Sequence, residues 1–265
     1  MSFPEVLEAD APQEVAVIYA ELRAAAGIPI VNLIWRHFAA LPGVLPWAWA
    51  TVRPVAGTAL LAEGIARFEA TALGTAGGAV RQFPAVAGEA LAVVETYNRG
   101  NCTNLQLLTA LRRIVAGEAA GGGGPLPAAS PLPPLPQIPA MPRLEALEPA
   151  TRARVLDLAA LHGDGGAAAV PSLYRHLALW PELLPPLQAA CAALMAEGTL
   201  PRGRDALLAE VQTMASRLLP ALRPPPGFPV EQRTAVLSAL DTFAGRLIAE
   251  MSVIGLLLRA AARPG

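Results

Sequence analysis

The chain has 265 residues, a formal net charge of −1 and a hydrophobic content of 54%, of which little is aromatic. The near-neutral charge argues against a nucleic-acid partner, which would require a basic surface. Ala and Leu dominate the hydrophobic residues, and both are strong helix formers, whereas strands favour β-branched and aromatic side chains. We therefore expect an all-α protein.

The basic residues, the cysteines and the acidic N-terminus further limit the chemistry and the cellular location that we expect. All 20 basic residues are arginine, which excludes chemistry that needs a lysine amine. The two cysteines, Cys102 and Cys191, lie far apart, so neither a disulfide framework nor a CxxC dithiol is expected. The acidic N-terminal residues and the Pro and Gly in the longest uncharged run predict a cytoplasmic protein with no membrane partner.

The first elements in chain order are short helices. Apolar residues recur at helical spacing over residues 12–25, and Gly27 and Pro29 are expected to end that helix. A second helix is predicted to begin near Val31. A third is predicted to begin at Pro46, because proline is well suited to the first turn of a helix.

Two longer helical segments follow. Residues 60–73 form the first, with charged residues on the outward face. Residues 86–115 predict one or two helices, with a break at residues 98–101, because Gly100 and its Asn neighbours favour a left-handed turn.

A segment rich in Gly and Pro, residues 117–142, divides the chain. Residues 121–124 are all glycine and predict a flexible joint. The prolines that follow favour an extended polyproline conformation, which rises about 3.1 Å per residue and can cross a domain face. We interpret this segment as a linker between a helical repeat at residues 1–116 and a second repeat at residues 143–265.

The two halves carry related sequences. Residues 31–46, VNLIWRHFAALPGVLP, recur as residues 170–185, VPSLYRHLALWPELLP, and residues 92–97 match residues 238–243. The offset is far longer than the roughly 20–50 residues of a solenoid repeat. We interpret the chain as an internally duplicated helical pseudo-dimer and expect its functional site between the two halves.

The chain resembles the group I 2-haloacid dehalogenase family. The similarity rests on the W-x-x-F spacing of Trp35 and Phe38, on the run V-P-x-x-Y-R-x-L-x-x-W-P over residues 170–181, and on the segment from Tyr97 to Asn101. With the duplication and the linker it covers nearly the whole chain. The resemblance implies an all-helical hydrolase that acts on halogenated short carboxylic acids without a metal or cofactor.

The resemblance also implies a catalytic asparagine, which maps onto Asn101, with Asn104 as the other candidate. In the family a carboxylate directly before the tyrosine of the second-half motif activates a water, and no covalent ester forms. The expected S-D-Y pattern here reads Ser172-Leu173-Tyr174. Leucine cannot act as a general base, a role typically worth roughly 10²–10⁴-fold in rate.

The remaining candidate residues form a substrate-binding wall implied by the resemblance. This wall consists of Trp35, Phe38, Tyr97, Ser172, Leu173 and Tyr174. Core packing is the alternative for the first two, which share one helical face, and helix capping is the alternative for Ser172. Asn101 could equally be a turn residue that follows Gly100.

Five other residues could supply the missing base or a structural contact. His37 and His176 follow an arginine in both copies, which favours a structural role, although imidazole suits a base near pH 7. Asp164 lies in a Gly-rich loop before the second motif. Glu95 and Asp241 occupy equivalent positions and either act structurally or approach each other between the halves.

Two functions follow from these residues. The first is a dehalogenase-like hydrolase in which Asn101 orients a water. The second is a non-catalytic descendant that binds a small carboxylic acid or has a structural role, which Leu173 favours because it adds apolar bulk. Three histidines without HxxxH spacing argue against a catalytic metal, and no cofactor is expected. A homodimer is an open alternative.

Overall fold

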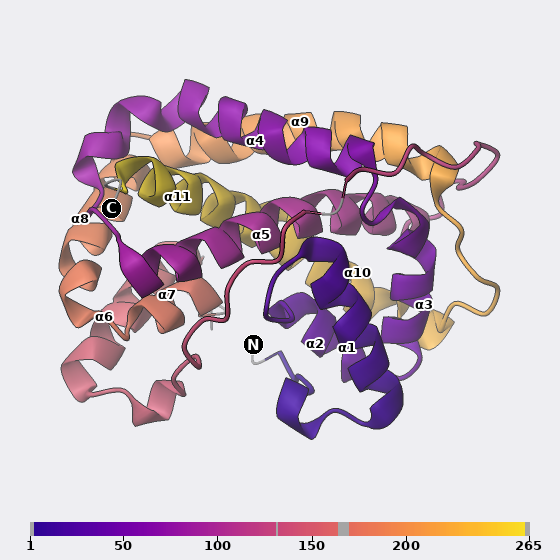
Figure 1. Cartoon of the computed structure of the whole chain (residues 1–265), viewed down its shortest axis with the longest axis horizontal. Coiled ribbons are helices and arrows are strands. Elements are labelled where there is room, and N and C mark those ends of the chain that lie inside the picture. Colours follow the sequence, from indigo (N-terminus) through magenta and orange to yellow (C-terminus); the bar gives the residue numbers. More distant parts are fainter. Residues whose placement is uncertain (1–2, 131, 164–169, 263–265) are drawn as a thin grey trace.

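The computed structural model describes residues 3–130, 132–163 and 170–262 and shows a helical protein (Figure 1). The helices of the first half are α1 (Gln13–Ala26), α2 (Leu33–Ala39), α3 (Val44–Val52), α4 (Ala59–Ala76) and α5 (Gly88–Val115). Those of the second half are α6 (Pro149–Ala160), α7 (Ser172–Leu177), α8 (Leu184–Ala196), α9 (Thr199–Leu218), α10 (Arg233–Thr242) and α11 (Ile248–Ala261). A π-helix, Phe243–Leu247, joins α10 to α11. The all-α expectation is confirmed.

Local chemistry explains several helix ends. Gly27 ends α1 in the left-handed conformation, with φ of 61°, and its N–H donates to carbonyls of the last turn. Gly43 has φ of 73° directly before α3, and Pro46 lies in the first turn of that helix. Thr58 caps α4, because its side-chain oxygen accepts from the Leu61 N–H. These ends lie close to the positions that the sequence predicts.

The predicted break at residues 98–101 is wrong, since α5 runs through it without interruption. Gly100 does not adopt a positive φ. A Cβ at this position would lie 2.9 Å from Asn32 Oδ1 and 3.0 Å from Ile28 Cδ1. The glycine therefore permits close packing against the segment before α2, and does not form a turn.

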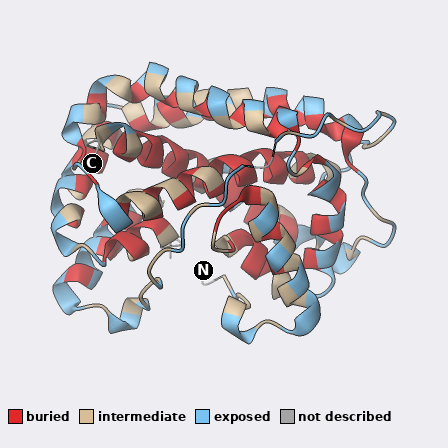
Figure 2. Cartoon of the chain, in the orientation of Figure 1, coloured by how far each residue is buried: buried red, intermediate tan, exposed pale blue. Residues whose placement is uncertain are grey.

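Helices from the two halves pack in one core. Helix α5 packs along α11, and α4 packs along α9, so each long helix contacts a helix of the other half. Figure 2 shows that α11 and the middle of α5 are buried at the centre of the molecule, whereas the first turn of α5 is exposed. The buried apolar side chains form a single cluster that includes both halves. The fold thereby brings α2 and α5 of the first half close to α7 and α11 of the second.

The order of helices in the second half is similar to that in the first. Short α2 and α7 carry the two Arg-His copies, and long α4 and α9 follow them. Helix α5 has α10, the π-helix and α11 as its counterpart in the chain order. This order agrees with the internal duplication, which stays a prediction together with the repeat boundaries.

The segment between α5 and α6 crosses the molecule in an extended conformation in front of α5 (Figure 1). Backbone hydrogen bonds attach it along its length. The Gly123 N–H donates to Pro220 O at 3.0 Å, and the Leu135 N–H donates to Gly27 O at 3.0 Å. An isolated β-bridge joins Thr58 to Ala128. Of the helices described, none has the length and hydropathy needed to cross a membrane.

Candidate functional site

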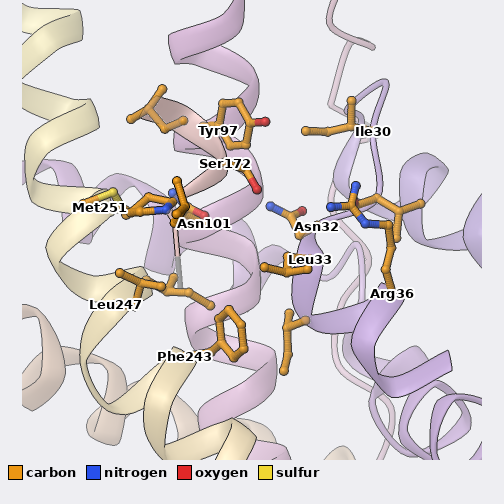
Figure 3. A pocket seen from close by; sticks show the side chains of 16 residues that line it. Ile30, Asn32, Leu33, Arg36, Tyr97, Asn101, Ser172, Phe243, Leu247 and Met251 are labelled. Carbon is orange, nitrogen blue, oxygen red and sulfur yellow. The ribbon is translucent and has the colours of Figure 1, made fainter. Parts of the chain in front are cut away.

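A cavity of about 60 Å³ lies where the two halves meet, between the start of α2, the middle of α5, the start of α7 and the turns around the π-helix (Figure 3). Most of its wall is apolar and includes Leu33, Leu173, Phe243, Leu247 and Met251. Its polar members are Asn32, Arg36, Tyr97, Asn101 and Ser172. In Figure 3 Asn101 lies near Met251 on the α11 side and Arg36 lies on the opposite side, with Ser172 and Asn32 between them.

Two carboxamides face this cavity without a protein partner. Asn101 lies in the middle of α5 and is 8% exposed, and its side chain makes no hydrogen bond to the described residues. The Asn32 side chain packs against Gly100 and likewise has no partner there. Asn32 is half-buried and Asn101 is nearly buried, and both line the cavity, so both amides are available to a polar ligand or to water.

Of the described residues that line the cavity, only Arg36 carries a charge. It lies on α2 with its side chain 10% exposed, and its Nε donates to Glu5 Oε2 at 2.7 Å. Its Nη1 donates to Val31 O at 3.1 Å. The guanidinium points toward Asn32 in Figure 3. Its positive charge is thus held at one end of the cavity and partly balanced by Glu5.

Tyr97 contributes a neutral hydroxyl. Burial raises the pKa of this phenol well above its ordinary value, although the charges of Arg36 and Arg175 and an interaction with Ser172 act in the opposite direction. Its Oη lies 3.3 Å from His176 Nδ1. Tyr97 therefore remains protonated at neutral pH and can donate a hydrogen bond.

Leu173 occupies the position expected for the catalytic carboxylate. It is 1% exposed and lines the cavity beside Ser172. Among the described lining residues there is no His, Asp or Glu. Asp164, the acidic residue closest before the motif, lies outside the described residues. The described wall can therefore bind a ligand but offers no general base.

The structure brings four of the sequence-predicted site residues together at this cavity, namely Tyr97, Asn101, Ser172 and Leu173. The capping alternative for Ser172 is wrong, because α7 begins with Ser172 itself and no side-chain cap is formed. The turn alternative for Asn101 is wrong as well, because the residue is helical.

Trp35 and Phe38 do not line the cavity. Trp35 Nε1–H donates to Asn104 Oδ1 at 2.8 Å, and the Phe38 ring packs edge-to-face against the indole at 5.8 Å. Both side chains are buried. The reason is helical geometry, since α2 presents Leu33 and Arg36 to the cavity and turns the other two toward the core of the first half.

Tyr174 also points away from the cavity, into a buried polar network. Its Oη lies 2.7 Å from His162 Nε2 and 3.8 Å from Cys191 Sγ. His162 Nδ1 lies 2.6 Å from Glu250 Oε2, and the side chains of both residues are almost fully buried. The other carboxylate oxygen accepts from Arg204 and Arg246.

The remaining sequence candidates have structural partners. His37 Nδ1 lies 2.8 Å from Pro4 O, and His176 Nε2 lies 2.7 Å from Pro139 O. Asp241 pairs with Arg112, whereas Glu95 lies 3.7 Å from Arg259. The two carboxylates therefore do not form a pair between the halves.

Several cavity residues were missed by the sequence argument, in particular Asn32, Arg36 and Phe243. One signal was present, because Phe243 aligns with Tyr97 in the second pair of matching segments, and both side chains line the cavity. Glu250, which lies in the buried network with His162 and not in the cavity, was also missed, although it is the only charged residue between residues 248 and 258. Asn32 and Arg36 had no such signal, because their orientation depends on how α2 packs.

No protein-family model and no curated protein matches the chain. Solved structures of D-2-haloacid dehalogenases do match. A mutant in complex with D-2-CPA has a TM-score of 0.84 and 19% identity, over 99% of this chain and 96% of that chain. A complex with L-LA has a TM-score of 0.81 and 19% identity, over 98% and 96% of the two chains. A D-2-halacid dehalogenase mutant has a TM-score of 0.78 and 19% identity, over 98% and 94%. The chain thus has the fold of these dehalogenases.

Proposed function

We propose that the cavity binds a short carboxylic acid of the 2-haloacid type, without hydrolysing it. The observation that carries this proposal is the pair of unpartnered carboxamides, Asn32 and Asn101, in a largely apolar cavity with Arg36 at one end. The carboxylate is placed at Arg36, and the hydrocarbon part lies against Leu33 and Met251.

The charge and donors of the wall favour an acid over a neutral or cationic ligand. The Arg36 Nη2 has no partner among the described residues and is available to a carboxylate oxygen. The Asn32 amide is a further donor beside it, and the Tyr97 oxygen, whose proton is directed at His176 Nδ1, can accept a hydrogen bond. Hydrogen bonds between charged groups are roughly twice as strong as neutral ones, so the acid gains most from this end of the cavity.

The size of the cavity favours a small ligand. A volume of about 60 Å³ exceeds the roughly 10–15 Å³ that one water requires. It is far below the roughly 300–1,000 Å³ of pockets for drug-sized ligands. A molecule with few non-hydrogen atoms and an apolar substituent fits both limits.

A second candidate function is dehalogenation of a 2-haloacid. The shared fold and the position of Asn101 in the cavity favour it. The reaction needs a base, and Leu173 stands where the sequence resemblance places the carboxylate. A dehalogenase would therefore require a base outside the described wall, for which Asp164 is the sequence candidate.

Calorimetric titration with 2-chloropropionate tests binding, with propionamide as the neutral comparison. We expect the acid to bind and the amide to bind far more weakly. Arg36→Gln removes a charged hydrogen-bond donor worth roughly 1.5–3 kcal/mol, which corresponds to about a 10- to 100-fold loss of affinity. Glu5→Gln is expected to tighten binding, because it frees the guanidinium from its carboxylate partner.

The matched control is Arg112→Gln. Arg112 also pairs with a carboxylate, that of Asp241, and does not line the cavity. Equal losses in the two arginine variants, or equal affinity for the acid and the amide, would contradict the proposal. Chloride release from either enantiomer by the unmodified protein would favour the second candidate.

A further inference from the structure

A second cavity adjoins the first. Its volume is about 230 Å³, and Ile30, Arg36 and Tyr97 line both cavities. Linker residues 137–141 form much of its remaining wall, together with His176 of α7. The proposed carboxylate position at Arg36 therefore lies at the boundary of two compartments.

The linker wall of this second compartment is held in place by side chains of α7. His176 Nε2 lies 2.7 Å from Pro139 O, and Arg175 Nη2 donates to Pro142 O at 3.2 Å. Burial is the main cause that lowers the pKa of His176, so the ring is neutral. Its Nε2–H donates to Pro139 O, and its Nδ1 accepts a hydrogen bond from the Tyr97 hydroxyl. The compartment is thus preformed.

The wall of the compartment is mixed, with an apolar strip beside a larger polar part that includes Gln137 and His176. Ile30, Ile138 and Met141 form the apolar strip. Arg36, which also lines the first cavity, supplies a positive charge. The carboxylate of Glu8 also lines the compartment, where it pairs with Arg23 and accepts the Val31 N–H at 2.8 Å. A second acidic group on the ligand would be repelled there.

We infer that the ligand is a medium-chain 2-substituted monocarboxylic acid, whose carboxylate binds at Arg36, whose small 2-substituent fills the inner cavity, and whose hydrocarbon chain lies under linker residues 137–141. The inference rests on the proposed acid-binding function. It extends that function from a three-carbon acid to a longer one and makes the linker part of the binding site.

The test is a calorimetric series of 2-chloro acids from three to eight carbons. Burial of one CH₂ contributes about 0.8 kcal/mol, so affinity is expected to rise about fourfold for each carbon that enters the compartment. Ile138→Trp fills the compartment and should abolish this gain. Leu132→Trp is the control, because Leu132 lies on the same linker but does not line this compartment.

The outcomes distinguish failure of this inference from failure of the proposed acid-binding function. A rise with chain length in the unmodified protein and in Leu132→Trp, absent in Ile138→Trp, supports the inference. A flat series with measurable binding of 2-chloropropionate overturns it and leaves the proposed function intact. A rise that persists in Ile138→Trp, or equal affinity for a dicarboxylic acid of the same length, also overturns it. Failure of every acid to bind overturns the proposed function as well.

Discussion

The hydroxyl of Tyr174 lies 2.7 Å from His162 Nε2, so the tyrosine next to Leu173 is fixed in the interior of the second half. Helix α7 therefore presents Ser172 and Leu173 to the cavity and Tyr174 to a buried polar network. This arrangement keeps the position of the expected catalytic carboxylate directed at the ligand site, although leucine occupies it. The site can be tested by restoring the carboxylate.

Leu173→Asp should create chloride release from 2-chloropropionate that the unmodified protein lacks. A positioned base is typically worth roughly 10²–10⁴-fold, and the new carboxylate would face Asn101 in the same cavity. Leu173→Asn is the control, because asparagine has nearly the shape of aspartate but cannot act as a base. Rates should increase with pH, because burial raises the pKa of an introduced carboxyl and only its ionised form is active.

Two results from these variants would contradict the prediction. If Leu173→Asp folds and binds 2-chloropropionate but releases no chloride, the cavity does not hold the acid in a hydrolytic orientation. Equal release by Leu173→Asp and Leu173→Asn would show that the introduced carboxylate is not the base.

Trp35→Phe should reduce stability without changing ligand affinity. The variant loses the indole N–H that donates to Asn104 Oδ1 at 2.8 Å and leaves that buried oxygen without a partner, at a cost of roughly 1–3 kcal/mol. Urea unfolding and calorimetry measure the two quantities. Phe243→Leu is the comparison, because Phe243 lines the cavity and its loss should weaken binding. Equal weakening in both variants would place Trp35 in the binding wall.

Glu250 should control stability in acid. Burial opposes its ionisation, yet the hydrogen bond with His162 and the charge of Arg246 outweigh burial and hold its pKa below the ordinary value of 4.5. A lowered pKa stabilises the folded state above the unfolded pKa, and this contribution is lost as pH falls through the folded pKa. We expect the free energy of unfolding to fall below about pH 4.5.

Glu250→Gln should lower the free energy of unfolding at pH 7 by about 3–5 kcal/mol and flatten its decline in acid. Glu63→Gln is the control, because Glu63 also has two arginine partners, Arg67 and Arg217, but is exposed to solvent and should matter little. Unfolding in urea from pH 3 to 8 measures both variants. Similar curves for the two would rule out a special role for the buried network.

Gly255→Ala and Gly74→Ala should change stability in opposite directions. Gly255 O accepts from Asn98 Nδ2 at 3.0 Å, and a Cβ at residue 255 would overlap the Asn98 amide oxygen. We expect a loss of about 1–3 kcal/mol from this overpacking between α5 and α11. A Cβ at Gly74 meets nothing within 4 Å, so alanine there should add about 0.5–1 kcal/mol through helix propensity. A stability gain in Gly255→Ala, measured by urea unfolding, would disprove the close contact.

The sequence by itself determined the helical class and much of the helix pattern. Abundant Ala and Leu favour helices through local propensity, and Gly27 ends α1 because glycine adopts a positive φ at little cost. The Gly/Pro-rich linker follows from the same local preferences. The sequence also placed Tyr97, Asn101, Ser172 and Leu173 in one group, and the fold brings these four side chains to one cavity.

Only the tertiary structure decided which side of each short helix faces the ligand site. Helix α2 is buried on several sides, so the apolar pattern cannot distinguish Trp35, which packs in the core, from Leu33, which lines the cavity. Gly100 likewise looked like a turn residue, but the close approach of Asn32 explains it. Local propensity depends on neighbours in the chain, whereas the direction of a side chain on a buried helix depends on packing between distant segments.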